Sequence, residues 1–189
     1  MTYKEIRHNE EVNELLKKGN QNLGLLGYTD HSQAHCTRVA ETAAHILKKF
    51  GYTEHDIELA RIAGYMHDIG NAVNRHEHAL TGAVMAFRIL DNMGMSAEEI
   101  AKVVSAIGNH DEGTGAPVNE IAAALILADK GDVRRSRVRP RAVHAGDIHD
   151  RVSYAVEASA LNISPRRDAV TLCLTIDTSI CASKRSQNS

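Results

Sequence analysis

The chain has 189 residues, of which 43% are apolar and 24% charged, and its formal net charge is -2. This length and composition predict one folded globular domain and exclude intrinsic disorder and fibrous architectures. The near-neutral charge disfavours a nucleic-acid coat or a membrane-surface protein, because such proteins attract their anionic partners through surplus basic residues.

The sequence shows no sign of export or of a membrane segment. Residues 1–20 lack the apolar core of a signal peptide, and no run reaches the roughly 18 apolar residues that span a bilayer. The three cysteines, Cys36, Cys173 and Cys181, form no CxxC pair that would suggest a zinc or redox site. We therefore expect a cytoplasmic protein in a reducing compartment.

Helical periodicity dominates the first two thirds of the chain. Apolar residues recur at helical spacing over residues 3–18, Gly19 is expected to end this helix, and residues 20–28 are expected to form a connector. Five further helices are predicted, from a cap at Thr29 or Asp30 to Phe50, from Thr53 to near Gly70, from His76 to Met93, from Ser96 to Ile107 and from Ile121 to Ala128. The last is apolar on every side, which predicts a central buried helix.

The C-terminal quarter differs from the rest. A short helix is expected over residues 148–158, and apolar and polar residues then alternate from 170 to 176, the period of a strand with one buried face. Because a lone strand is not stable, we expect it to pair with a hairpin partner around Leu161 and Ile163, or with a second copy of the chain in a homodimer.

Eleven histidines stand out in a chain that has no tryptophan, and they crowd between His31 and His149. His67 and Asp68 lie in the last predicted turn of a helix, among apolar neighbours. An imidazole and a carboxylate at a helix end can converge on metal ions, but buried His-Asp pairs without metal also exist. The interpretation therefore depends on further candidate ligands.

Four such candidates, His35, His78, His110 and Asp129, each lie on a separate predicted element. Helical bundles build internal metal sites in this way, with one ligand from each of several facing helices. Asp129 follows eight apolar residues, and a carboxylate is costly to bury there unless it is paired or bound to metal. Alternatively, it caps the helix or pairs with Lys130 or an arginine.

These residues stand in blocks that resemble the HD superfamily of metal-dependent phosphohydrolases. The blocks are residues 35–40 (HCTRVA), 63–70 (AGYMHDIG), 78–83 (HALTGA), 106–110 (AIGNH) and 127–130 (LADK). Their order and spacing match over about residues 30–140. The resemblance implies a mainly α fold, an HD-domain helical bundle, here with a small C-terminal β element. We expect the chain to divide into residues 1–28, a metal-binding helical domain at 29–158, and an appendage with a polar tail at 159–189.

The resemblance also implies which residues bind metal. One divalent ion is expected on His35, His67, Asp68 and Asp129, and His78 and His110 match members with a second ion, where Asp68 bridges the two. A mononuclear site would need only the first four. Nitrogen and oxygen ligands suit Fe or Mn, with Zn, Co, Ni or Mg as alternatives, and the residues alone do not select among them.

Other residues are candidates for catalysis and phosphate binding. His67 and Asp68 are expected to take part in catalysis through the metals, and Asp111, with Glu112 beside it, is a candidate proton acceptor. Substrate phosphate needs positive partners, and the candidates near the ligands in sequence are Arg38, Lys130, Arg134 and Arg135. The five arginines of residues 134–141 have no interleaved aromatics, so nucleic-acid binding is not expected.

Two further histidines are alternatives to predicted ligands. His31 lies one helical turn before His35, and His76 lies two residues before His78, so each is a second candidate for its neighbour's role or for substrate contact. Only His35 and His78 match the family blocks, which favours them. No such context surrounds the five remaining histidines, His8, His45, His55, His144 and His149. Separately, the 113–115 loop (GTG) is a candidate substrate-side loop.

The leading functional hypothesis is hydrolysis of a phosphate ester or anhydride, in a nucleotide or related small phosphometabolite, by a metal-activated water. A second hypothesis is oxidative, because some HD-fold proteins that resemble inositol oxygenase hold a mixed-valent di-iron centre on the same six ligands. The third is a non-catalytic nucleotide sensor, which would bind without turnover.

Overall fold

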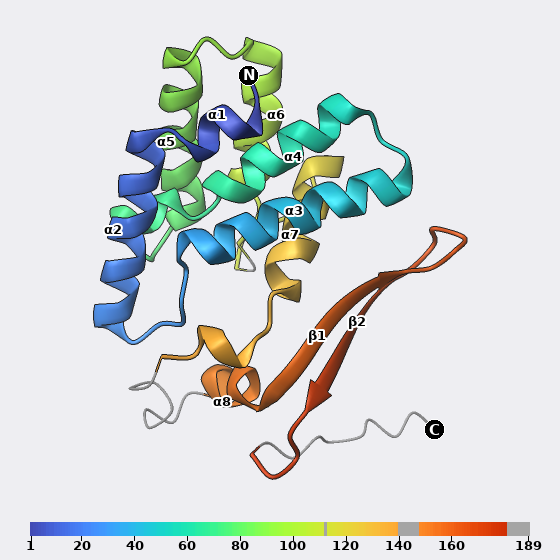
Figure 1. Cartoon of the computed structure of the whole chain (residues 1–189). Coiled ribbons are helices and arrows are strands. Elements are labelled where there is room, and N and C mark those ends of the chain that lie inside the picture. The colour runs from blue at the N-terminus through green and yellow to red at the C-terminus, as the bar shows by residue number, and fades with distance from the viewer. Residues whose placement is uncertain (112, 140–147, 181–189) are drawn as a thin grey trace.

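A computed structural model describes residues 1–111, 113–139 and 148–180 (Figure 1). Its elements are α1 (Tyr3–Arg7), α2 (Glu10–Leu26), α3 (Gln33–Phe50), α4 (Glu54–Met66), the 3-10 turn η1 (Ile69–Ala72), α5 (His78–Asn92), α6 (Ala97–Gly108), α7 (Glu120–Gly131), the 3-10 turn η2 (Arg135–Arg137), α8 (Ile148–Ala155), β1 (Val156–Ile163) and β2 (Val170–Ile176). The predicted fold class is confirmed: a mainly helical domain carries a small C-terminal sheet.

Helix boundaries follow local capping chemistry. The capping box at the start of α6 is confirmed, with the Ser96 hydroxyl accepting from Glu99 N and the Glu99 carboxylate accepting from Ser96 N. The predicted cap of α3 at Thr29 or Asp30 is wrong. Ser32 is the N-cap, and the Asp30 carboxylate instead accepts hydrogen bonds from the Ser32 amide and hydroxyl.

The predicted helix end at Gly19 is also wrong, because α2 continues through the expected connector to Leu26. Gly27, at φ 87°, terminates it. Gly19 is buried against η1, and a Cβ at this position would lie 3.1 Å from both Asn71 Cβ and the Ala72 nitrogen. The glycine therefore permits close packing of α2 on η1 rather than ending the helix.

Helices α3, α4 and α7 form the centre of the molecule, with α3 and α4 side by side (Figure 1). Their inward faces are apolar and fully buried. The prediction that α7 is buried is right for the face that carries Ile121, Leu125 and Ala128, whereas Leu127 on another face is 38% exposed. Gly64 of α4 lies directly on the α3 backbone, where a Cβ would come within 2.7 Å of Ala40 Cα. This close approach brings the first turn of α3 beside the end of α4.

The end of α4 differs slightly from the prediction. The helix stops at Met66, so His67 is its C-cap and Asp68 lies just outside it, before η1. A Cβ at Gly70 in η1 would overlap the backbone of His78 and lie 2.6 Å from the Gly82 nitrogen. This contact fixes the start of α5 against the chain that follows Asp68.

The hairpin prediction is confirmed within the chain. β1 and β2 pair antiparallel, with Leu161 opposite Leu172 and Ile163 opposite Val170. Leu161 and Ile163 pack against the helical core. Helix α8 is shorter than predicted, because residues 156–158 already belong to β1. Dimerisation through this hairpin stays a prediction.

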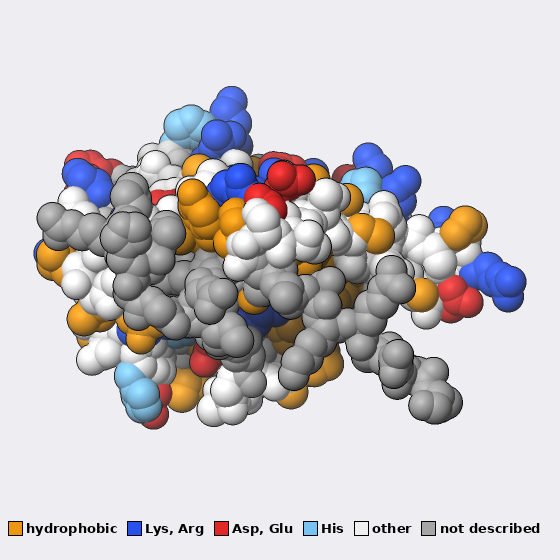
Figure 2. Space-filling view, turned by 90° about the horizontal axis from the view of Figure 1, so that it is seen from below, with side chains coloured by type: hydrophobic (Ala, Val, Ile, Leu, Met, Phe, Trp, Pro, Cys, Tyr) orange, Lys and Arg blue, Asp and Glu red, His pale blue; other side chains and the backbone are white. Residues whose placement is uncertain are grey.

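Surface chemistry agrees with the near-neutral net charge. On the face in Figure 2, the described Lys and Arg side chains are scattered among acidic and apolar ones rather than gathered into one patch. Among the described helices, none combines the length and apolarity needed to cross a bilayer.

Candidate metal centre

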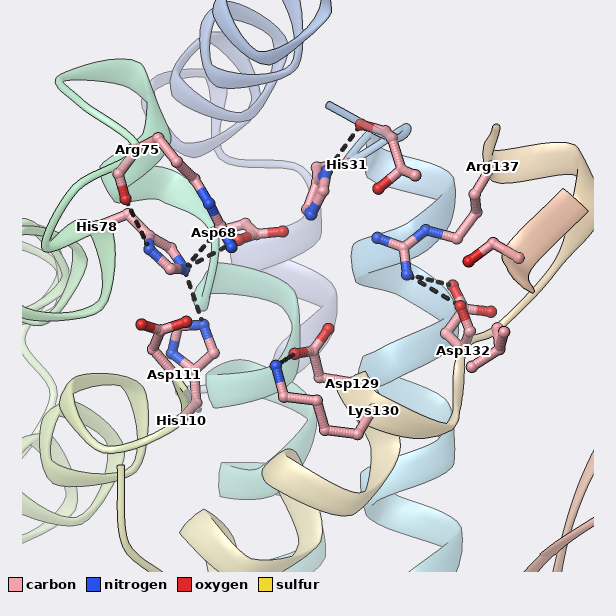
Figure 3. A pocket seen from close by; sticks show the side chains of 13 residues that line it. His31, Asp68, Arg75, His78, His110, Asp111, Asp129, Lys130, Asp132 and Arg137 are labelled. Carbon is pink, nitrogen blue, oxygen red and sulfur yellow. Dashed lines mark hydrogen bonds and ion pairs between the residues drawn. The ribbon is translucent and has the colours of Figure 1, made fainter. Parts of the chain in front are cut away.

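A cavity of about 190 Å³ opens where α3, α4, α5, α6 and α7 converge (Figure 3). It is lined by Thr29, His31, Asp68, Arg75, His78, His110, Asp111, Asp129, Lys130, Asp132, Val133, Arg137 and Ser153. All six residues predicted to bind metal lie at or directly behind this cavity, and four of the six are almost fully enclosed histidines.

The first donor group consists of His35, His67 and Asp129. His35 Nε2 lies 3.3 Å from Asp129 Oδ1, and His67 Nε2 lies 3.8 Å from the same oxygen. All three donor atoms fall within 4.8 Å of one another. They come from the first turn of α3, the C-cap of α4 and the last turn of α7, so helix packing rather than sequence proximity brings them together.

The second donor group consists of Asp68, His78 and His110, and its donor atoms also lie within 4.8 Å of one another. His78 opens α5 and His110 follows α6. Their Nε2 atoms are 3.2 Å apart. Two nitrogens bound to one ion at about 2.1 Å each can be separated by at most about 4.2 Å, so this spacing fits a shared ion.

Asp68 connects the two groups. Its Oδ2 lies 3.1 Å from His67 Nε2 and 3.7 Å from His35 Nε2, whereas its Oδ1 lies 3.8 Å from His78 Nε2. The Asn71 amide donates to Oδ1 at 2.8 Å and to the Asp68 carbonyl, which holds the carboxylate in place. One oxygen therefore faces each group, as a bridging carboxylate requires.

A contact at Nδ1 orients each of the four imidazoles, three through a backbone carbonyl and one through a carboxylate. His67, His78 and His110 each place Nδ1 near a carbonyl oxygen, those of Gly64, Arg75 and Ile107, at 2.8, 3.1 and 2.6 Å. His35 Nδ1 faces the Asp132 carboxylate at 2.7 Å. In a neutral imidazole, an Nδ1–H donated to such an acceptor leaves the Nε2 lone pair toward the cavity, which is the arrangement of metal-binding histidines.

Unpartnered polar atoms support the same interpretation. His35 Nε2 and Asp68 Oδ2 are buried, and their contacts are ion pairs within the cluster, to Asp129 Oδ1 at 3.3 Å and to His67 Nε2 at 3.1 Å, rather than hydrogen bonds of regular geometry. Buried polar atoms without a partner are unfavourable by about 1–3 kcal/mol each. A divalent cation would satisfy both, so the donor set fits metal ions.

The histidines of the two donor groups differ in protonation. Burial opposes the imidazolium form of His67, but the Asp68 and Asp129 carboxylates outweigh it and raise the pKa of His67 to about 9. Burial lowers the pKa of His110 to about 4 and also lowers that of His78. The second group is therefore neutral at its imidazoles, whereas His67 carries a proton that a metal ion would have to displace.

We accordingly expect metal binding to release about one proton below pH 9. Because His67 is protonated below a pKa of about 9, the apparent metal affinity should rise roughly tenfold per pH unit toward that value and level off above it. Titration calorimetry of Mn²⁺ in two buffers with different ionisation enthalpies measures the released proton. An affinity that does not change between about pH 6.5 and 8.5 would contradict this assignment.

Asp132 lies behind the first donor group and was not predicted from the sequence. Its carboxylate is buried, accepts from His35 Nδ1 and from Arg134 at 2.6 and 2.9 Å, and forms an ion pair with Arg38 at 3.1 Å. Burial opposes its ionisation, but the His35 and Arg134 hydrogen bonds hold the pKa of Asp132 well below its usual range. As a permanent anion, it therefore orients the imidazole of a candidate metal ligand.

Replacing Asp132 by asparagine should weaken metal binding by about 10- to 100-fold, because the candidate ligand His35 loses its anionic partner. The loss should fall on the first donor group, since Asp132 does not contact His78 or His110. Metal titration with stoichiometry tests this. An equal loss at both groups would mean that the substitution disturbs the fold instead.

The four predicted phosphate-binding residues do not lie together. Lys130 lines the cavity, with its Nζ 3.2 Å from Asp129 Oδ2. Arg38, Arg134 and Arg135 instead line a neighbouring hollow of about 620 Å³ beside β1. Their role in phosphate binding stays a prediction without support from the cavity's geometry.

Two arginines that the sequence analysis missed do line the cavity, Arg75 before α5 and Arg137 in η2 (Figure 3). Arg137 is held by the carbonyls of Asp30 and Asp132, each at 2.9 Å. Nearness in sequence favoured the arginines close to Asp129, but the chain turns after α7. That turn leaves Arg134 outside the cavity lining and brings Arg137 into it.

The remaining candidates have clear positions. Asp111 lines the cavity beside His110, as expected of a proton acceptor, and Glu112 lies outside the described residues. His31 lines the cavity too, but its Nδ1 contacts the Thr29 carbonyl and burial lowers its pKa to about 4. His76 is exposed. The geometric groups thus contain His35 and His78 rather than these two neighbours.

Comparison with known proteins assigns the chain to a family. The HD domain family matches residues 33–152. The uncharacterized protein MJ1020 of Methanocaldococcus jannaschii is 31% identical over 180 residues, covering 83% of this chain and 69% of the relative. A crystal structure of a predicted HD superfamily hydrolase from an uncultured Thermotogales bacterium superposes with a TM-score of 0.51 at 25% identity, over 67% of this chain and 69% of that one. The chain is a member of the HD family and has the fold of its metal-dependent phosphohydrolases.

Proposed function

We propose that this protein hydrolyses a phosphate ester or anhydride of a nucleotide or related small metabolite, with two divalent ions in the cavity. The observation that carries the proposal is Asp68, whose two oxygens face two separate groups of donor atoms. His35, His67 and Asp129 would hold one ion and His78 and His110 the other. Ions bound in this way supply Lewis acidity and an activated water for attack on phosphorus.

The protein's own side chains would position the phosphate and handle its protons. Lys130, Arg75 and Arg137 place three positive charges on the cavity wall, where phosphate oxygens would lie. Asp111 is on the same wall and is the candidate proton acceptor. These groups surround a small polar cavity, which fits a phosphoryl group and leaves the rest of the substrate outside.

A second pocket, of about 550 Å³, adjoins the cavity and is the candidate site for that remainder. It shares Arg75, His78 and Asp111 with the cavity, so the two spaces lie side by side. Tyr28 and Leu80 on its wall are about half exposed and offer apolar surface. A volume in this range is typical of small-molecule sites. The size and the exposed ring favour a substrate as large as a nucleoside.

The proposal is tested with metal-free protein reloaded with Mn²⁺, Fe²⁺ or Mg²⁺ and assayed for phosphate release under anaerobic conditions. The substrate panel contains nucleoside mono-, di- and triphosphates and sugar phosphates, and His67→Ala is the inactive control. Turnover that depends on the ion and is lost in His67→Ala supports the proposal. A strict requirement for iron and dioxygen would favour the oxygenase hypothesis, and tight nucleotide binding without turnover would favour a sensor.

A further inference from the structure

Arg75 contacts both nitrogens of one candidate metal ligand. It lies on the short segment between η1 and α5, three residues before His78. Its carbonyl oxygen faces His78 Nδ1 at 3.1 Å, and its guanidinium Nη1 donates to His78 Nε2 at 3.2 Å. The side chain therefore contacts Nε2, the His78 nitrogen that faces Asp68 and His110 in the second donor group (Figure 3).

The position of this guanidinium has an electrostatic reason. His78 Nε2 lies 3.2 Å from His110 Nε2, and the Nδ1 atom of each ring faces a backbone carbonyl. With both Nδ1 atoms protonated, two nitrogen lone pairs face each other in a buried site beside the Asp68 carboxylate. A cation beside these nitrogens relieves the repulsion between the two lone pairs, and the Arg75 guanidinium provides one.

A metal ion and this guanidinium exclude each other. The Nε2 atom of a neutral imidazole has one lone pair, so it can accept a hydrogen bond from Arg75 or bind an ion, but not both. Any ion on Asp68, His78 and His110 must therefore displace the Arg75 side chain.

The surroundings give the displaced side chain a defined place. The guanidinium carbon lies 5.5 Å from the centre of the Tyr28 ring, a cation-π contact that does not involve the candidate ligands. Arg75 lines both the metal cavity and the adjoining 550 Å³ pocket. A guanidinium that leaves His78 and stays near Tyr28 lies between the metal cavity and the adjoining pocket. At this point the phosphate of a substrate in the cavity would be bonded to the part of the substrate that lies in the pocket.

We propose that Arg75 holds the place of the second metal ion and, once an ion displaces it, becomes a positioning residue for the phosphate of the substrate. The phosphate part rests on the proposed function. The competition with the ion does not, because it follows from the contact with His78 alone. Arg75 thereby makes phosphate binding conditional on a complete metal centre.

Arg75→Met is the decisive variant, because the competition with the ion predicts a higher Mn²⁺ affinity and the phosphate contact predicts a lower phosphate affinity. Without the competing hydrogen bond, the second Mn²⁺ should bind about tenfold more tightly in calorimetric titration. Inorganic phosphate should bind the Mn²⁺-loaded variant about tenfold more weakly, because a charge-assisted contact is lost. His78→Ala identifies the second binding step by abolishing it. Arg88→Met, which removes a surface arginine paired with Glu11, is the matched control and should change neither affinity.

Two further measurements keep the outcomes distinct. Repeating the Mn²⁺ titration in about 0.5 M salt screens the long-range effect of removing a charge, so a tightening that persists reflects the direct contact. Arg75→Lys keeps the charge but loses the planar donor fork, and it should restore phosphate binding only in part. Unchanged Mn²⁺ affinity in Arg75→Met, or a joint loss of ion and phosphate affinity, overturns the proposal. If Arg75→Met binds Mn²⁺ more tightly but the unmodified protein hydrolyses no phosphate ester, the competition between Arg75 and the ion is supported and only the proposed function is rejected.

Discussion

Asp68→Asn should lose both metal ions and at least about a thousandfold in phosphate release, the largest effect of any single substitution in the centre. The asparagine keeps the size of the side chain but removes the charge that faces His67 on one side and His78 on the other. Without Asp68, the first donor group keeps one anionic donor, Asp129, and the second keeps none. Neither group can then retain a divalent ion tightly. Elemental analysis and the phosphate-release assay measure the two losses.

The matched control is Asp91→Asn, an exposed carboxylate at the end of α5 that lies outside the cavity lining. It should bind two ions and turn over like the unmodified protein. An Asp68→Asn protein that still binds two ions and hydrolyses substrate at the normal rate would refute the shared carboxylate. Loss of one ion alone would assign Asp68 to a single donor group.

Gly64→Ala should destabilise the fold and the centre together. A Cβ at Gly64 would lie 2.7 Å from Ala40 Cα and 2.9 Å from the Ala40 nitrogen, and neither backbone atom can move alone. Overpacking of this kind lowers the free energy of unfolding by about 1–3 kcal/mol, although alanine is intrinsically the better helix former. Urea unfolding followed by circular dichroism, with chelator present, measures the change.

The substitution should also weaken metal binding, because the Gly64 carbonyl accepts the hydrogen bond that orients His67. Gly108→Ala is the control: its Cβ would meet only the Ala83 methyl, at 3.5 Å, and the protein should be at least as stable as the original. If Gly64→Ala unfolds at the same urea concentration and binds the same ions, the contact between α3 and α4 is not the constraint inferred from the structure.

The metal-binding candidates were predictable because their sequence blocks are local and distinctive. His67 and Asp68 interrupt an apolar segment, and Asp129 ends a helix that is apolar on every side, so each is conspicuous without knowledge of the fold. The structure brings all six candidates together, with four of them lining one cavity and His35 and His67 lying against these, although the six come from five elements. The capping box at Ser96 was equally predictable, because its hydrogen bonds join residues three positions apart.

What the sequence could not supply depends on long-range packing. Gly19 has the same signature as a helix terminator, and only its contact with η1 shows that it permits close approach instead. Asp132 follows a helix end like many solvated carboxylates, and only the fold places it behind His35. The same holds for Arg75 and Arg137, whose positions depend on the direction of loops rather than on a pattern in the chain.

Because the donors of the centre come from five separate elements, an unfolded chain offers no comparable site. Ions that bind only the native state stabilise it by mass action, by about 2.7 kcal/mol at a hundredfold excess over the dissociation constant. The supply of divalent metal in the cell would then set how long the protein survives as well as how fast it works. Metal starvation would lower its abundance through proteolysis of the opened, ion-free form.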